Sequence, residues 1–501
     1  MDFDVRKFDQ YRENNRLEVK KAKGGLPISL WETYSSMANC YGGVILLGVI
    51  EKEDGSFETT GLKDVEKLRR EFWNLVNNAQ KVSVNLLTDS DLESYEVNGD
   101  VILAVYMPRA RREDKPVYIN GDMFKGTFRR DGEGDYHCTR AEVKAMLRDQ
   151  TEETMDMKVL EDMEMSDLNL ETVHAYRNRH SAYRSEHVWE ALKDDEYLER
   201  IGAAKHAKFD GKLHPTAAGL LMFGEEYKIL YEYPEYFLDY REMLDPSIRW
   251  TDRLQSSSGD WTGNLFDFFF RVNSKLAKDL KIPFKLEGIT RIDDTPVHKA
   301  LREALANCLV NTDFFEPRGV VIRKEQDKII LENPGYIRTG KDQMLKGGIS
   351  DPRNKALMKM FNMIGIGERA GSGVPDIYAV WESQGWMTPE IEEQYNPDRT
   401  VLTLSFEVRN EANEVRNGVR NEVTNAWLAS FTEAKRKKAL LIISEIMTDK
   451  HITIQRIADN TGITKSTVDR YIADLKDIGV IVREGSTKSG YWRIEEGFLN
   501  E

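Results

Sequence analysis

Hydrophobic and polar positions show a clear helical period near the C-terminus, within residues 439–494. The apolar run from Ala439 to Met447 predicts a leading helix. In the two segments after it, apolar side chains recur three and four positions apart, which predicts two amphipathic helices. Two short apolar runs around Val482 and Trp492 follow and predict a two-stranded hairpin. The apolar positions are Ile454, Ile457 and Ala458 in the first helix and Val468, Ile472 and Leu475 in the second.

The residues between these helices have the chemistry of a tight turn. Gly462 can adopt a left-handed backbone, and Thr464 is a suitable N-cap for the second helix. Helix, turn, helix and hairpin in this order resemble a winged helix-turn-helix, which implies DNA as the partner and the second helix as the reading element. The implied DNA contacts are Lys465, Ser466, Thr467, Arg470, Tyr471 and Lys488.

The charge of this segment agrees with a nucleic-acid partner. Residues 432–493 hold 12 Lys and Arg against 8 Asp and Glu, whereas the whole chain has a formal net charge of −14. Binding to a polyanion must therefore come from local basic patches. A three-helix protein-interaction module with a solvated charged face is the alternative.

The N-terminal region combines short apolar runs with helical periods. Residues 43–50, 101–107 and 125–130 are expected to form strands. The motifs Glu-x-x-x-x-Glu-x-Lys from Glu13, Ala-Asn-x-x-Gly-Gly-x-x-x-x-Gly-Val from Ala38 and Gly-Thr-Phe-Arg-Arg ending at Arg130 resemble the Schlafen AlbA-type domain. The resemblance covers about residues 10–150 and implies nucleic-acid binding, to DNA or RNA.

The same resemblance raises a second function. In RNA-cleaving Schlafens, carboxylates at the positions of Glu13 and Glu18 help to form a metal-dependent nuclease site for Mg²⁺ or Mn²⁺. Glu51 or Asp54 would have to supply the third carboxylate here. The implied alternative is a nuclease that acts on RNA or single-stranded DNA, for example in phage defence. Otherwise Glu18 is an ordinary strand residue in a structural ion pair.

Basic residues cluster in the later part of this region, where a nucleic-acid groove and a solvated charged face are both open. Arg129 and Arg130 are the candidate nucleic-acid contacts because they belong to the family motif. The whole cluster consists of Arg109, Arg111, Arg112, Arg129 and Arg130.

The central region contains a helix, residues 296–313, with two different faces. Glu303, Asn307 and Asn311 are four positions apart and share one polar face, whereas leucines occupy the other. A Gly-x-Gly turn follows at Gly371-Ser372-Gly373, where backbone N–H groups at a helix start can bind phosphate. This combination resembles the divergent GHKL-type ATPase domain of many transcriptional regulators, over about residues 290–407.

The resemblance implies ATP and Mg²⁺ as cofactors. Glu303 would activate water and Asn307 would hold Mg²⁺, and the other implied cofactor contacts are Asn311, Gly335, Gly371, Ser372 and Gly373. The usual Asp-x-Gly-x-Gly that reads adenine is replaced by Glu332-Asn-Pro-Gly335. A slow ATPase and a rigid dimerisation core are therefore both open, and the absence of a Gly-x-x-x-x-Gly-Lys-Ser/Thr loop argues against a motor.

Composition sets the remaining bounds. Three scattered cysteines and the lack of a long apolar run favour a cytoplasmic protein without a membrane partner. The expected domains are 1–150 (AlbA-like), 151–407 (connecting helices and GHKL-like), 408–434 (polar linker) and 435–501 (winged helix). The predicted fold class is a multidomain α/β (α+β) protein with a central GHKL-like α/β sandwich. The leading function is a homodimeric, DNA-binding transcriptional regulator.

Overall fold

The computed structural model divides the chain into two compact units, Met1–Phe406 and Glu407–Glu501. Most of the expected linker at 408–434 lies outside the described residues. The structure describes residues 3–151, 153–245, 247–278, 285–287, 290–292, 295–367, 372–395, 398–408, 442, 445–446, 452–461, 463–477, 481–484 and 491–494.

The N-terminal module of the first unit is built on a four-stranded mixed sheet. Its elements are β1 (Leu17–Lys20), α1 (Ser29–Asn39), β2 (Gly43–Leu47), β3 (Val49–Glu51), β4 (Phe57–Thr59), α2 (Val65–Val76), β5 (Leu92–Val97), β6 (Asp100–Met107), α3 (Met123–Gly126), β7 (Phe128–Asp131), β8 (Gly134–His137) and α4 (Arg140–Gln150). The strand order is β1-β2-β6-β5, and only β1 and β2 are parallel. Strand β2 contributes to a hydrophobic cluster on each face, which explains its uninterrupted apolar run.

The expected strands in this module are observed with one shift. The segment at 43–50 divides into β2 and β3, and the segment at 101–107 lies within β6. The segment at 125–130 becomes a strand only from Phe128. The carboxylate of Asp122 accepts hydrogen bonds from the N–H groups of Phe124 and Lys125, so it caps a short helix in place of the expected strand start.

A connecting helical segment joins the N-terminal and central modules. It consists of α5 (Leu170–Tyr183), α6 (Asp194–Ile201), the hairpin β9 (Ala204–His206) and β10 (Leu213–Pro215), α7 (Ala217–Phe223) and α8 (Glu226–Glu232). Every residue of α7 is buried, and its side chains belong to the large hydrophobic core of the central module. The segment is therefore part of that core rather than a separate linker.

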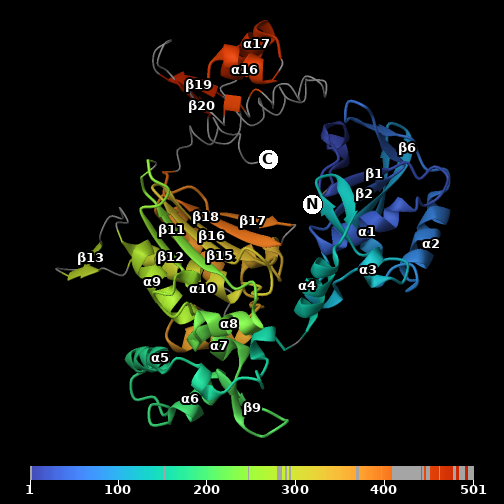
Figure 1. Ribbon diagram of the computed structural model, residues 1–501. Helices are drawn as coiled ribbons and strands as arrows, with labels where there is room; N and C mark the ends of the chain where they lie inside the picture. Colours follow the sequence, from blue (N-terminus) through green and yellow to red (C-terminus); the bar gives the residue numbers. More distant parts are fainter. Residues whose placement is uncertain are drawn as a thin grey trace. The chain divides into compact units, whose positions relative to one another are not determined.

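The central module is an α/β sandwich with a six-stranded sheet (Figure 1). Its elements are β11 (Leu238–Met243), β12 (Asp252–Gln255), α9 (Leu265–Ala277), the hairpin β13 (Lys285–Glu287) and β14 (Thr290–Ile292), α10 (Pro296–Val310), β15 (Val320–Glu325), β16 (Lys328–Pro334), α11 (Lys341–Lys346), α12 (Lys355–Met363), α13 (Gly373–Ser383), β17 (Glu390–Gln394) and β18 (Arg399–Ser405). The strand order is β12-β11-β15-β16-β18-β17, and β11 pairs with β15 in parallel. Burial alternates along β15, since helices including α9 and α10 cover one face of the sheet.

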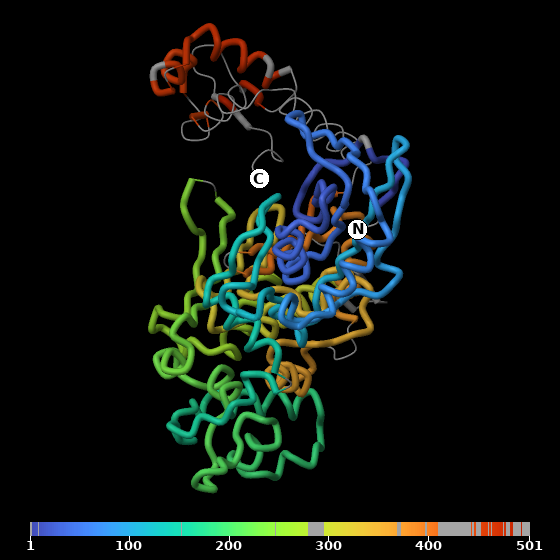
Figure 2. The backbone as a smooth tube through the Cα atoms, turned by 90° about the vertical axis from the view of Figure 1, so that its right-hand side faces the viewer, coloured from blue at the N-terminus to red at the C-terminus, as the bar shows by residue number. Residues whose placement is uncertain are grey.

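Short 3-10 helices complete the first unit. They span Val5–Gln10, Asp89–Asp91, Arg112–Asp114, Met155–Met157, Met165–Asp167 and Ser256–Ser258. The tube in Figure 2 follows the first unit from the blue N-terminal module through the green connecting helices to the orange strands of the central sheet.

The second unit has the predicted helix, helix and hairpin in order, while the leading helix expected at 439–447 lies mostly outside the described residues. It contains α16 (Ile454–Thr461), α17 (Lys465–Asp477) and the antiparallel pair β19 (Ile481–Glu484) and β20 (Tyr491–Ile494). Val468, Ile472 and Leu475 are buried in its core, as their spacing predicted. The indole N–H of Trp492 donates a hydrogen bond to the carbonyl of Ile452 at 3.0 Å, which ties the hairpin to the helices.

A buried ion cluster stabilises the N-terminal module and corrects one prediction. The guanidinium of Arg130 has 0% exposure and contacts the carboxylates of Glu18 at 2.6 Å and Asp135 at 2.9 Å. It also donates to the backbone carbonyl of Asn14 at 2.9 Å. The assignment of Arg130 as a nucleic-acid contact is therefore wrong, because the side chain is enclosed and its charge is neutralised inside the module.

Replacement of Arg130 by Met should destabilise the N-terminal module by about 3–5 kcal/mol, because two buried carboxylates lose their counter-charge. Urea unfolding measures this free energy. Arg6→Met is the matched control, since the Arg6 side chain is 86% exposed beside Asp4 and the loss of such a surface pair changes stability little. Equal stability of the two variants would contradict a structural role for Arg130.

Candidate functional site

A cavity of about 140 Å³ lies between the polar face of α10 and the sheet of the central module. Residues of α10, β16, β18, β17 and the start of α13 line it. The chain between β16 and α12 adds residues from Tyr336 to Pro352, and Met358 of α12 completes the lining. This cavity brings together side chains that are widely separated along the sequence.

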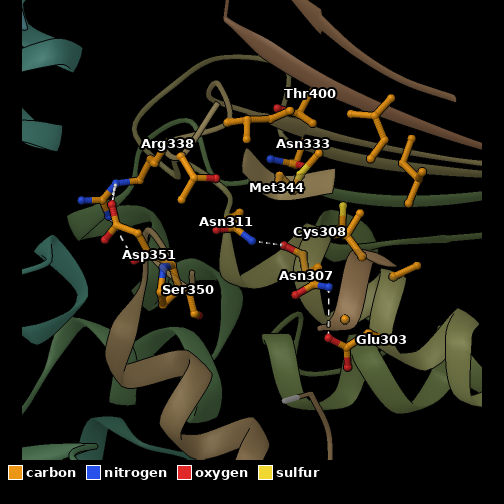
Figure 3. Close-up of a pocket in the computed structure, with 18 of the residues that line it drawn as sticks. Glu303, Asn307, Cys308, Asn311, Asn333, Arg338, Met344, Ser350, Asp351 and Thr400 are labelled. Carbon is orange, nitrogen blue, oxygen red and sulfur yellow. Dashed lines mark hydrogen bonds and ion pairs between the residues drawn. The ribbon is translucent and has the colours of Figure 1, made fainter. Parts of the chain in front are cut away.

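Helix α10 carries the predicted polar face. The helix starts at Pro296 behind a capping box formed by Thr295 and His298, and its apolar face is packed into the core. Glu303, Asn307 and Asn311 all line the cavity. The amide nitrogen of Asn307 donates to Glu303 Oε1 at 3.1 Å, and that of Asn311 donates to the carbonyl of Asn307 at 2.9 Å, as Figure 3 shows.

The start of α13 closes one side of the cavity beside Glu303. A Cβ atom at Gly373 would lie 2.0 Å from Oε1 of Glu303, so glycine at this position leaves room for the carboxylate at the helix start. Backbone N–H groups at a helix start favour negative charge, which suits a carboxylate or a phosphate. Ser372 precedes the helix and is not among the lining residues, and Gly371 lies outside the described residues.

The other end of the cavity is largely apolar, with two polar side chains. Asn333 and Thr400 lie there, at the opposite end of Figure 3 from Glu303. The amide of Asn333 donates to the carbonyl of Pro334 at 3.1 Å, and the hydroxyl of Thr400 donates to that of Gly335 at 2.8 Å. The apolar lining consists of Leu331, Ile337, Met344, Ile349, Ile391 and Leu402. Such an apolar slot with a few polar groups suits a planar heterocycle.

Gly335 has a different place from the one expected. It does not line the cavity. Its φ is +98°, and a Cβ atom at this position would lie 2.9 Å from the guanidinium of Arg353. The neighbouring Asn333 lines the cavity instead. The sequence contained a signal for the role of Asn333. In the altered segment Glu332-Asn-Pro-Gly335, this polar residue stands near the end of a buried strand and close to the expected glycine.

The residues of the cavity fit a nucleotide with Mg²⁺. Glu303 and Asn307 supply oxygen donors of the kind that Mg²⁺ prefers, beside the positive end of α13. Within the described residues, no group of three or more His, Cys, Asp or Glu could hold a metal ion. A Mg²⁺ ion here would therefore take most of its ligands from water and phosphate oxygens.

The carboxylates of the suggested nuclease site are arranged as a structural cluster. Glu18 is paired with Arg130 and Lys20. Glu13 accepts a hydrogen bond from the N–H of Val19 at 2.8 Å, and burial raises its pKa from 4.5 to about 7. Burial and the nearby Glu133 also raise the pKa of Glu51. The Glu18 carboxylate is therefore engaged in ion pairs. Among the described residues, the metal-site geometry expected from the nuclease family is absent.

Four arginines of the basic cluster in the N-terminal module, Arg109, Arg112, Arg129 and Arg130, are paired with carboxylates. Arg129 is partly buried, with Glu142 at 3.1 Å and Asp131 at 3.5 Å from its guanidinium. Arg109 and Arg112 instead reach residues of the central module. These ion pairs support neither the nucleic-acid groove nor the solvated charged face at Arg109, Arg112 and Arg129, whereas Arg111 is exposed.

The second unit presents part of its predicted DNA contacts. Lys465, Ser466 and Arg470 are exposed on α17, and Thr467 is half-buried. Tyr471 is only 3% exposed and packs in the hydrophobic core, so its assignment as a DNA contact is wrong. Its position beside Ile472 and one turn before Leu475 places it on the buried stripe. Lys488 lies outside the described residues.

Four parts of the chain match known domain families. Residues 13–139 match "Schlafen, AlbA_2", and residues 144–239 match a domain of unknown function. Residues 317–404 match "Putative ATP-dependent DNA helicase recG C-terminal", and residues 438–491 match "HTH domain". The three modules named from the sequence are thus each present, in the predicted order. No curated protein matches the chain.

Two solved structures are similar to the chain. The DIP2311 protein from Corynebacterium diphtheriae is 18% identical, with 96% of this chain and 91% of that chain covered and a TM-score of 0.40. The N-terminal domain of the "Putative ATP-dependent DNA Helicase RecG-related Protein" from Nitrosomonas europaea is 26% identical. That match covers 27% of this chain and 90% of that chain, with a TM-score of 0.20.

Within the described residues, no helix combines the length and the apolar character needed to cross a bilayer. The three cysteines, Cys40, Cys138 and Cys308, are buried free thiols.

The half-buried Glu13 carboxyl predicts a pH-dependent stability. Its folded-state pKa of about 7 lies above the ordinary 4.5, so ionisation destabilises the folded state as the pH rises between these values. Glu13→Gln keeps an oxygen acceptor for Val19 and removes the charge. The variant should melt a few degrees above the wild type at pH 8, and this difference should vanish below about pH 4.5.

Thermal melts across this pH range measure the effect. Glu53→Gln is the control because Glu53 is exposed, and its melting temperature should follow the wild type at every pH. A Glu13→Gln curve parallel to the wild type from pH 4 to pH 8 would show that Glu13 is not buried in its neutral form.

Proposed function

We propose that this chain is a DNA-binding transcriptional regulator that binds ATP with Mg²⁺. It carries a Schlafen AlbA_2 domain, a RecG C-terminal-type domain and a helix-turn-helix domain. The supporting observation is the central cavity, where the polar face of α10 meets the start of α13 and an apolar slot. The winged helix supplies the DNA contact through the exposed face of α17. Nucleotide and DNA then bind to separate units of one chain.

Each part of the cavity has a role in nucleotide binding. Asn333 and Thr400 meet the polar edge of the base, and the surrounding apolar side chains cover its faces. Gly373 and the N–H groups at the start of α13 receive phosphate oxygens. Asn307 holds Mg²⁺, and Glu303 is placed to orient or deprotonate a water molecule, which also allows slow hydrolysis.

The regulator acts as a homodimer in the cytoplasm under this proposal. A two-fold dimer matches DNA half-sites one helical turn, or a multiple of it, apart. The nuclease alternative receives less support, because Glu18 is held by Arg130 and Lys20. Incubation with RNA or single-stranded DNA and Mn²⁺ tests that alternative directly, and cleavage that is lost in Glu18→Gln would restore it.

Replacement of Asn307 by Ala should weaken ATP binding at least about tenfold in the presence of Mg²⁺, because the metal loses a ligand. The loss should be much smaller in EDTA. Isothermal titration calorimetry of the full chain measures both affinities. Asn178→Ala, on the exposed side of α5, is the matched control and should bind like the wild type.

Two results of this titration would count against the assignment. A wild-type protein that binds no ATP would remove the nucleotide role of the cavity. ATP binding of equal strength in Asn307→Ala and the wild type would leave a nucleotide site but remove Asn307 as its metal ligand.

Replacement of Arg470 by Ala should weaken DNA binding about tenfold and lower the slope of log affinity against log salt by about one. The probe is the duplex that the wild-type chain selects from a random-sequence library. Lys208→Ala removes one exposed positive charge from the first unit and is the control. An unchanged affinity and salt slope in Arg470→Ala would contradict the reading role of α17.

A further inference from the structure

One wall of the cavity is a long connection with little regular structure of its own. The wall segment, residues 335–354, runs from the end of β16 to the start of α12 and contains only the six-residue helix α11. It supplies a large share of the cavity lining, from Tyr336 to Pro352. Glycines with positive φ interrupt it at Gly340, Gly347 and Gly348. Such a segment needs contacts from outside to hold one conformation.

The N-terminal module provides the first of these contacts through Arg109. Its guanidinium binds both carboxylate oxygens of Glu393, at 2.6 and 2.9 Å, and donates to the carbonyl of Ile337 at 3.0 Å. The same carboxylate accepts the N–H of Ile337 at 2.8 Å. Arg109 and Glu393 thus fix both backbone polar groups of a residue in the cavity wall, in a bidentate geometry.

The second contact lies at the other end of the wall segment and uses Arg112. Its Nε donates to Asp351 at 2.7 Å, and Asp351 lies 3.5 Å from Nε of Arg338. Figure 3 shows Asp351 and Arg338 side by side at the edge of the cavity. The guanidinium of Arg112 also donates to the carbonyl of Asp149 at 2.9 Å, so the contact extends to the end of α4.

Burial makes these contacts strong. The side chains of Arg109 and Arg112 are 16% and 10% exposed, and that of Glu393 is 5% exposed. Loss of one member would leave its partner charge poorly solvated, so the interface favours the paired state. The Lys115 ammonium lies 4.4 Å above the ring of Tyr336 and adds a third contact between the N-terminal module and the wall segment.

We propose that Arg109 and Arg112 are positioning residues of the nucleotide cavity, supplied by the N-terminal module. Nucleotide binding then depends on the docking of the AlbA-type domain, and a nucleotide in the cavity stabilises that docking to the same extent. This coupling rests on the proposed nucleotide function. In this coupling, Arg109 and Arg112 link the binding of ATP to the docking of the N-terminal module on the central module.

The test uses the full chain with Arg109→Ala and Arg112→Ala. Arg111→Ala is the matched control, because Arg111 lies between them in sequence and is exposed. Hydrogen exchange without nucleotide should be faster in residues 335–354 of both variants and unchanged in the control. The affinity for ATP and Mg²⁺, measured by calorimetry, should fall at least about tenfold in Arg109→Ala, a factor typical of supporting residues that orient ligand groups.

A charge exchange separates positioning from general stability. Arg109→Glu should behave like Arg109→Ala or worse, and the double variant Arg109→Glu with Glu393→Arg should recover part of the exchange protection and of the ATP affinity. Absence of recovery, in a double variant with a wild-type circular dichroism spectrum, would overturn the proposal. This comparison remains decisive if a single variant fails to fold.

The remaining outcomes distinguish this coupling from the nucleotide function itself. Equal exchange and equal ATP affinity in Arg109→Ala and the wild type would overturn the positioning role and leave the nucleotide site intact. If the wild type binds no ATP, the nucleotide function and its coupling to the N-terminal module both fail. In that case, faster exchange confined to residues 335–354 of the arginine variants would show that the contact between the N-terminal module and the wall segment is purely structural.

Discussion

The close approach of Glu303 on α10 to Gly373 at the start of α13 is the constraint on which the central cavity depends. A side chain at Gly373 would displace the Glu303 carboxylate and so remove the negative group from the helix start. The apolar face of α10 meanwhile belongs to the largest hydrophobic core of the chain. One helix therefore determines both the stability of the module and the position of its polar site.

Periodicity in the sequence predicted the elements that carry a strong local signal. The spacing of Glu303, Asn307 and Asn311 indicated one polar helix face, and all three side chains line the cavity. The buried stripe of α17 was equally predictable, since Val468, Ile472 and Leu475 recur at helical spacing. These predictions succeeded because helix geometry alone determines which side chains share a face.

Residues whose role depends on long-range contacts could not be predicted in this way. Arg130 belongs to a basic motif, yet its partners Glu18 and Asp135 are brought to it only by the folded sheet. Arg109 was one of several clustered arginines, and Glu393, its partner, lies 284 positions away. Sequence shows that such charges exist, whereas tertiary structure decides whether they face solvent or one another.

Photolabelling with an azido-substituted ATP tests most directly whether the cavity of the central module binds ATP. Peptide mapping by mass spectrometry should place the label in residues 331–354 or 399–405, which surround Asn333, Met344 and Thr400. Excess ATP with Mg²⁺ should abolish this labelling. Labelling that excess ATP does not reduce, or that falls entirely on other segments, would contradict the account.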